Sequence, residues 1–158
     1  MLPLLFQKER IMIGIVVSGH IHFASGMETA VRAIAGEQEQ MLFIDFVEGM
    51  STQELEQSLR QAVQDVDSGD GVLILTDIPG GSPANRALEI MMDTPNVELI
   101  GGANLPMIAN AAFERDDAEL TELVDTLLDI GMSCMKDMRR ELNSIMEQPT
   151  ELECEDGL

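Results

Sequence analysis

The run Ile11-Met12-Ile13-Gly14-Ile15-Val16-Val17 is the stretch that decides the fold. Its apolar residues are continuous rather than alternating, which is typical of a strand buried on both faces of a parallel sheet. Ser18-Gly19-His20 follows, and apolar residues then recur at helical spacing from Phe23 to Ile34. The sequence therefore predicts a buried strand over 11–17, a very short loop, and an amphipathic helix that Gly36 ends.

The same alternation of strand and helix recurs further along the chain. Residues 41–46 read as a second buried strand, 72–75 as a third strand, and 97–100 as a short fourth. A capping-box sequence, Ser51-Thr-Gln-Glu54, is predicted to begin the helix after the second strand. The apolar stripe of that helix is Leu55, Leu59, Ala62, Val63 and Val66.

After the third strand, Ser82 is predicted as an N-cap and Pro83 as the first helical residue. The inner face of this helix is expected to be Ala84, Ala87, Leu88 and Met91. Four strand–helix units predict an α/β fold, a doubly wound and mainly parallel sheet in the order 2-1-3-4 with helices on both faces.

From Asp116 onward, periodic apolar residues predict a helical C-terminal segment of one or two helices, with Gly131 as a break. Its Met-rich stripe is expected to lie in the core or at a dimer interface. We expect a single domain over residues 11–146, preceded by an N-terminal arm (1–10) and followed by an acidic disordered tail (147–158).

Composition excludes several classes of function. The 158 residues carry 9 Lys and Arg against 29 Asp and Glu, a net charge of −20, which disfavours nucleic acid and anionic membranes as partners. No run of eighteen apolar residues occurs, and the N-terminal patch Leu2–Phe6 lacks a basic leader, so we expect a cytoplasmic protein. Two isolated cysteines, Cys134 and Cys154, and two histidines predict no metal site, and we expect no cofactor.

Candidate chemistry lies just after the strands, where open α/β sheets bind their ligands. His20 follows the first strand and Asp77 the third, and a 2-1-3-4 order makes them face each other. A carboxylate that accepts a hydrogen bond from one imidazole N–H leaves the other ring nitrogen as a nucleophile. Beside this pair, Gly80, Gly81 and Ser82 lead into a helix whose free N–H groups suit a phosphoryl group. Histidine phosphorylation is therefore the leading hypothesis.

Ordinary interpretations of the same residues remain open. A histidine in a surface loop commonly has no function, and the run from Asp77 to Gly81 also fits a turn followed by an N-cap. His22 is expected to cap the helix or to be solvated. Other phosphate chemistries lack their motifs, because the chain has no Walker loop and no acidic pair after the first strand.

Several ordered motifs resemble the mannose-family enzyme IIA components of the sugar phosphotransferase system. The resemblance covers roughly residues 12–142. Within the family, the segment Phe23-Ala24-Ser25-Gly26-Met27 is most similar to the N-acetylgalactosamine and related amino-sugar branch. The other motifs are Gly19-His20, Gly36-Glu37-Gln38, Ile44-Asp45-Phe46, Thr76-Asp77, Gly80-Gly81-Ser82-Pro83 and Gly102-Ala-Asn-Leu-Pro-Met107.

The resemblance implies a phosphoryl relay. In the family the general carrier HPr phosphorylates the histidine that matches His20, which then phosphorylates enzyme IIB, and IIB serves the membrane subunits IIC and IID. The residue matching Asp77 orients the ring through Nδ1, so the phosphoryl group is carried on Nε2. The family forms homodimers, with sheet exchange in some members. Many members have glycine and a hydroxyl residue where Ile21 and Ile78 stand here.

Two other functions remain as alternatives. A regulatory module, or a phosphoryl donor for a dihydroxyacetone-type kinase, would use the same histidine. A non-catalytic dimeric scaffold would not need it. Neighbouring IIB, IIC and IID genes would favour transport, and a neighbouring kinase gene would favour the donor module.

Overall fold

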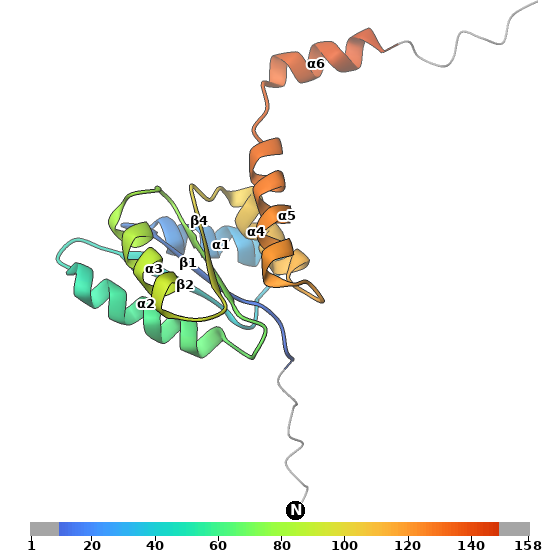
Figure 1. The fold of residues 1–158 in the computed structure, drawn as a ribbon. Helices are drawn as coiled ribbons and strands as arrows, with labels where there is room; N and C mark the ends of the chain where they lie inside the picture. Colours follow the sequence, from blue (N-terminus) through green and yellow to red (C-terminus); the bar gives the residue numbers. More distant parts are fainter. Residues whose placement is uncertain (1–9, 149–158) are drawn as a thin grey trace, which may run out of the picture.

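The computed structural model describes residues 10–148. Within that range strands and helices alternate as far as α4, and two further helices follow (Figure 1). The elements are β1 (Gly14–His20), α1 (Phe23–Ala35), β2 (Met41–Phe46), α2 (Thr52–Val66), β3 (Val72–Thr76), α3 (Ser82–Asp93), β4 (Val97–Gly101), α4 (Leu105–Glu114), α5 (Leu120–Ser133) and α6 (Met138–Glu147). In this part of the chain, no helix is long and apolar enough to cross a membrane.

The strands form a parallel sheet in the order β2-β1-β3-β4. Helices α1, α4 and α5 pack on one face, and α2 and α3 pack on the other (Figure 1). The predicted doubly wound α/β fold and its strand order are confirmed. Because the strand order reverses between β1 and β3, the carboxyl ends of these two strands flank the switch point at which open α/β sheets bind ligands.

Strand β1 is displaced toward the C-terminus relative to its prediction. The Ser68 hydroxyl donates to the Met12 carbonyl (2.9 Å) and accepts from the Met12 N–H (3.1 Å), so the strand ladder begins only at Gly14. At its other end the ladder continues to His20, which pairs with Phe46 of β2. The strand therefore holds the backbone of His20 itself, which the sequence had assigned to a loop.

The second strand is only partly buried, which corrects the expectation of a fully buried one. Met41 is buried, whereas Leu42 is 37% exposed and the rest of β2 is half-buried. The reason is that β2 is an edge strand with a neighbour on one side only. Helix α2 matches its prediction, with the capping box of Ser51 and Glu54 and the buried stripe Leu55, Leu59, Ala62, Val63 and Val66.

Helix α3 begins differently from its prediction. Gly81 is the N-cap, Ser82 is the first helical residue, and the Ser82 side chain makes no cap hydrogen bond. The buried face of α3 is shifted by about one residue toward the N-terminus relative to the predicted inner face. Leu88 is 42% exposed, and the buried residues are Pro83, Ala84, Ala87 and Ile90.

The helices after β4 depart most from the sequence pattern. Helix α4 was not predicted, and Gly131 lies inside α5 rather than at a break. The glycine leaves room there for the end of the Met107 side chain of α4. Asn104 ties the two helices together: its Oδ1 accepts from the Met107 N–H (3.1 Å) and its Nδ2 donates to the Gly131 carbonyl (2.8 Å). The break falls instead between Ser133 and Met138.

Helix α6 stands away from the other described elements (Figure 1). It has no buried residue, and Met138 and the preceding Met135 are 71% and 80% exposed. Of the two expected places for the Met-rich stripe, core or dimer interface, the core is therefore excluded for this part. The predicted arm and tail fall on residues that are mostly outside the described range. Arg10 is described and pairs with Asp116 (2.9 Å), and Glu147 belongs to α6. The boundaries at 10 and 146 stay predictions.

Candidate active site

His20 and Asp77 meet at the switch point of the sheet. His20 is the last residue of β1, and Asp77 directly follows β3. His20 Nδ1 lies 2.8 Å from Asp77 Oδ2, and the backbone N–H of His20 donates to the same oxygen (2.8 Å). Two neighbouring parallel strands thus bring together residues that are 57 positions apart in the sequence.

The Asp77 carboxylate is almost fully surrounded by its hydrogen-bond donors. Its side chain is 10% exposed, and Oδ1 accepts from the Ile78 N–H (2.8 Å). Burial alone would raise the pKa of Asp77, but the hydrogen bonds from the His20 backbone, the His20 ring and the Ile78 backbone together hold this pKa below its usual value. The group therefore faces the imidazole as a carboxylate at neutral pH.

The His20 ring is fixed on its other sides by Gly81 and Phe46. A Cβ atom at position 81 would stand 2.7 Å from His20 Cε1, so only glycine leaves room for the ring. The Phe46 ring meets the imidazole edge to face, with 6.0 Å between the ring centroids. The His20 side chain remains 40% exposed. With Nδ1 held by Asp77, Nε2 is the ring nitrogen left for chemistry.

Residues 78–81 form a tight turn beside the His20 ring. Gly81 N–H donates to the Ile78 carbonyl (3.1 Å), and Gly80 has φ +82°, which with Pro79 before it is the pattern of a type II turn. The Gly81 amide is therefore already used, and Gly81 contributes space rather than a donor. Helix α3 begins at the next residue, so the loop delivers a helix N-terminus to the switch point.

A second histidine–aspartate contact lies beside the first. Asp45, in β2, accepts from the Ser25 N–H through Oδ1 (2.9 Å), and its Oδ2 is 3.4 Å from His22 Nδ1. Burial raises the pKa of Asp45, but the hydrogen bonds from Ser25 and His22 outweigh burial and lower it.

Asp45 thus caps the first turn of α1. The His22 side chain makes no cap hydrogen bond and is 76% exposed, so of its two expected roles it is the solvated one. Sequence reasoning missed the capping role of Asp45, because the capped amide is 20 residues away and nothing local marks it.

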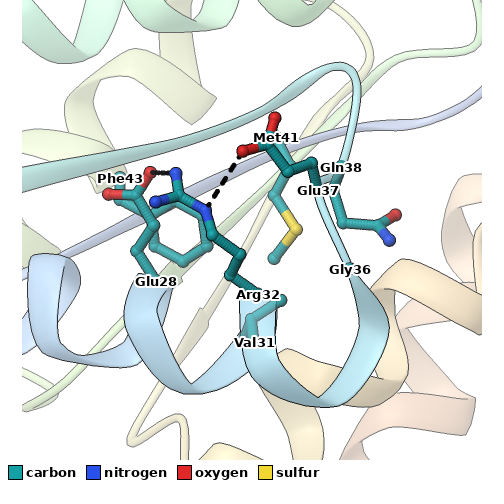
Figure 2. Close-up of a pocket in the computed structure, with 8 residues that line it drawn as sticks. All are labelled: Glu28, Val31, Arg32, Gly36, Glu37, Gln38, Met41 and Phe43. Atoms are coloured by element: carbon teal, nitrogen blue, oxygen red, sulfur yellow. Dashed lines mark hydrogen bonds and ion pairs between the residues drawn. The ribbon is translucent and has the colours of Figure 1, made fainter.

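The hollow between α1 and β2 is remote from this chemistry. It has a volume of about 60 Å³, and Figure 2 shows Arg32 lying across it toward Glu28 and Glu37, with contacts of 3.1 and 3.6 Å. Its residues come from α1, from the loop over residues 36–38 and from the start of β2, at the far end of the sheet from His20. Among residues 10–148, no three His, Cys, Asp or Glu side chains are grouped to hold a metal ion.

Comparison with known proteins identifies relatives that match most of the chain. The family model EIIA-man, described as PTS system fructose IIA component, matches residues 14–128. The mannose-specific EIIAB component of Escherichia coli (strain K12) is 34% identical over 128 residues, which are 80% of this chain and 40% of that protein. The fructose-specific EIIA component of Bacillus subtilis (strain 168) is 29% identical over 116 residues, 73% of this chain and 80% of that protein.

A solved structure agrees with these sequence relatives. The phosphotransferase system component EIIA from Streptococcus agalactiae has a TM-score of 0.76 at 27% identity and covers 82% of this chain and 99% of its own. The chain spans about two fifths of the length of the E. coli relative. The family model covers all four strands of the described sheet, helices α1 to α4 and most of α5. This chain therefore belongs to the mannose family of enzyme IIA components of the sugar phosphotransferase system.

Proposed function

We propose that this protein is a phosphocarrier, which accepts a phosphoryl group from HPr on Nε2 of His20 and passes it to enzyme IIB. The observation that carries the proposal is the 2.8 Å contact between His20 Nδ1 and Asp77 Oδ2. A carboxylate at that place holds the ring proton on Nδ1 and leaves the Nε2 lone pair free to attack.

The transfer step exchanges one phosphorus–nitrogen bond for another. The Nε2 lone pair attacks phosphorus while the bond to the donor's histidine breaks. The donor ring, which carries a proton on its other nitrogen, leaves as neutral imidazole. The His20 ring keeps its Nδ1 proton and becomes positively charged, and the Asp77 carboxylate balances that charge. The same step in the other direction, with IIB as acceptor, returns His20 to its starting form.

The phosphoryl oxygens need donors, and the start of α3 offers them. We assign this role to the Ser82 hydroxyl and to the N–H groups of Gly80 and Ser82, since the Gly81 N–H is bound to Ile78 and Pro83 has none. The helix dipole adds partial positive charge at the same place. Gly81 serves the site by leaving space for the ring.

In this proposal HPr and enzyme IIB both act from the cytoplasm, and IIB links the relay to the membrane subunits IIC and IID. The EIIAB name of the E. coli relative supports IIB as the acceptor. A net charge of −20 favours carriers with a basic docking face. The N-acetylgalactosamine branch stays a prediction based on residues 23–27.

We also propose a homodimer in which α6 packs on a second copy of the chain. One face of α6 carries exposed apolar side chains, Met138, Leu142, Ile145 and Met146. Exposed apolar faces of this kind are uncommon on monomers. Three basic residues, Lys136, Arg139 and Arg140, lie just before and at the start of the same helix. Lys136 and Arg140 pair with Glu141 and Asp137 (3.6 and 3.3 Å), and Arg139 adds a positive charge that favours contact with an acidic surface such as this chain's own.

Labelling with radioactive phosphorylated HPr tests the phosphocarrier function. We expect acid-labile label on the wild type and on His22→Ala, and none on His20→Ala. Peptide mapping by mass spectrometry should place the label on the imidazole of His20. Label retained by His20→Ala would overturn the proposal, and His22→Ala controls for loss of a neighbouring exposed histidine.

A further inference from the structure

Ile21, which directly follows His20, has an unusual backbone conformation. Its φ is +53°, in the left-handed region that β-branched residues avoid because Cβ crowds the following carbonyl. Its side chain is 45% exposed, so the fold gains little burial from it. Strained residues of this kind often mark functional sites.

The turn, rather than the side chain, imposes this conformation. Only Ile21 and His22 separate β1 from α1. The Ile21 N–H donates to the Phe46 carbonyl (2.8 Å), and the His22 carbonyl accepts from the Gly26 N–H (2.8 Å), so both ends of the turn are fixed. Glycine would adopt this conformation with less strain. Folding alone therefore does not explain an isoleucine at position 21.

A second exposed isoleucine stands next to the other half of the pair. Ile78 follows Asp77 and is 56% exposed. Its N–H donates to Asp77 Oδ1 (2.8 Å) and its carbonyl accepts from the Gly81 N–H (3.1 Å). Two exposed isoleucines thus directly follow His20 and Asp77 in the chain, on backbones that hydrogen bonds hold in place.

We propose that Ile21 and Ile78 form an apolar docking ring for the phosphohistidine-bearing donor protein, an inference that rests on the phosphocarrier function proposed above. For transfer, the two imidazole rings must approach phosphorus from opposite sides, so the surface of the donor must lie on the residues beside His20. The isoleucines lose water in that contact, and their fixed backbones reduce the entropy lost on docking. The net charge of −20 attracts a donor with a basic rim, and the ring fixes its position.

Comparing two phosphoryl donors distinguishes an effect on protein docking from an effect on the transfer step at His20. Phosphorylated HPr needs a docking surface, whereas phosphoramidate is a small molecule that transfers its phosphoryl group and releases ammonia without one. The ring variants are Ile21→Gly, which keeps the turn, and Ile78→Ala. The matched controls are Ile34→Ala, an equally exposed isoleucine (57%) at the other end of α1, and Asp117→Gly, another position with positive φ (+58°).

We expect each ring variant to lower the second-order rate constant with phosphorylated HPr about five-fold, and both together about 25-fold. Rates with phosphoramidate should match the wild type, and the urea midpoint of unfolding should not fall below the wild-type value. The two controls should match the wild-type rates with both donors. Unchanged rates with HPr, or equal losses with both donors, would overturn the docking ring. A wild type that neither donor labels on His20 would instead overturn the phosphocarrier function.

Discussion

Oδ2 of Asp77 meets two nitrogens of His20, the backbone N–H and the imidazole Nδ1, each at 2.8 Å. The first contact fixes the carboxylate relative to the end of β1, and the second fixes the ring relative to the carboxylate. The other oxygen, Oδ1, accepts from the Ile78 N–H (2.8 Å). Both oxygens of Asp77 are therefore acceptors, and both help to set the orientation of the ring.

Asp77→Asn should slow phosphoryl transfer on the order of 100-fold or more while leaving the protein folded at neutral pH. An amide has one oxygen, so its NH₂ group must face either the Ile78 N–H or the imidazole Nδ1. The first arrangement loses a hydrogen bond, and the second places the ring proton on Nε2. Single-turnover transfer from phosphorylated HPr measures the effect. A wild-type rate in this variant would remove Asp77 from the mechanism.

The lowered pKa of Asp77 also predicts a change in acid stability. A carboxyl whose folded-state pKa lies below its usual 3.8 stabilises the folded protein above that pH, and this stabilisation is lost as the pH falls through the folded-state pKa. The free energy of unfolding of the wild type should therefore fall more steeply below pH 3.8 than that of Asp77→Asn. Urea titrations at neutral and acidic pH compare the two slopes, and parallel curves would contradict the expectation.

Gly81→Ala should abolish most transfer with little loss of stability. The backbone of Gly81 (φ −74°, ψ 168°) suits alanine, but the new Cβ would lie 2.7 Å from His20 Cε1 and push the ring from Asp77. Gly26→Ala is the matched control, because a Cβ at that helical position meets nothing within 4 Å and should stabilise the protein by about 0.5–1 kcal/mol. Full transfer by Gly81→Ala would show that the ring position is not critical.

Arg115 at the far end of the sheet is predicted to matter for stability only. It is 2% exposed, and its guanidinium donates to the carbonyls of Ile13 (3.4 Å) and Gln40 (3.0 Å) and to Gln38 Oε1 (3.3 Å). Arg115→Met removes these hydrogen bonds, leaves the Gln40 carbonyl with the Ile15 N–H as a donor, and should lower the free energy of unfolding by about 2–4 kcal/mol. Chemical denaturation measures this loss. The transfer rate per folded molecule should stay at the wild-type value.

Leu142→Glu should shift the proposed dimer toward monomer. Leu142 is 45% exposed on α6, and a carboxylate there would be buried against the partner. Sedimentation at several concentrations reports the association constant, which we expect to fall about 100-fold or more. Met92→Glu changes an exposed methionine (77%) on α3 and serves as control. Equal association of wild type and Leu142→Glu would exclude α6 as the interface.

Local sequence signals predicted much of the fold, for a physical reason. The capping box of Ser51 and Glu54 closes within one helical turn, and its hydrogen bonds depend on no distant residue. The strand order placed His20 opposite Asp77, because carboxyl ends of parallel strands share one edge of the sheet. The missed α4 carries its cap signal in Asn104, with Pro106 in the first turn, and its Ala-rich interior left only a weak periodic pattern.

The sequence by itself determined the α/β class, because hydrophobic periodicity and turn residues act over a few positions. The topology typical of that class then predicted the strand order and the pairing of His20 with Asp77. Only the tertiary structure decided that the Gly81 amide is already bound, that Asp45 caps α1, and that Ile21 is held in a left-handed turn. The Asp45 cap and the Ile21 turn depend on contacts between separate strands and loops, whereas the Gly81 hydrogen bond closes within the turn over residues 78–81. Short-range hydrogen bonds can be anticipated from neighbouring residues, and the meeting of strand ends from the topology. The backbone angle of a single loop residue and a cap supplied by a distant side chain are decided only once the sheet is assembled.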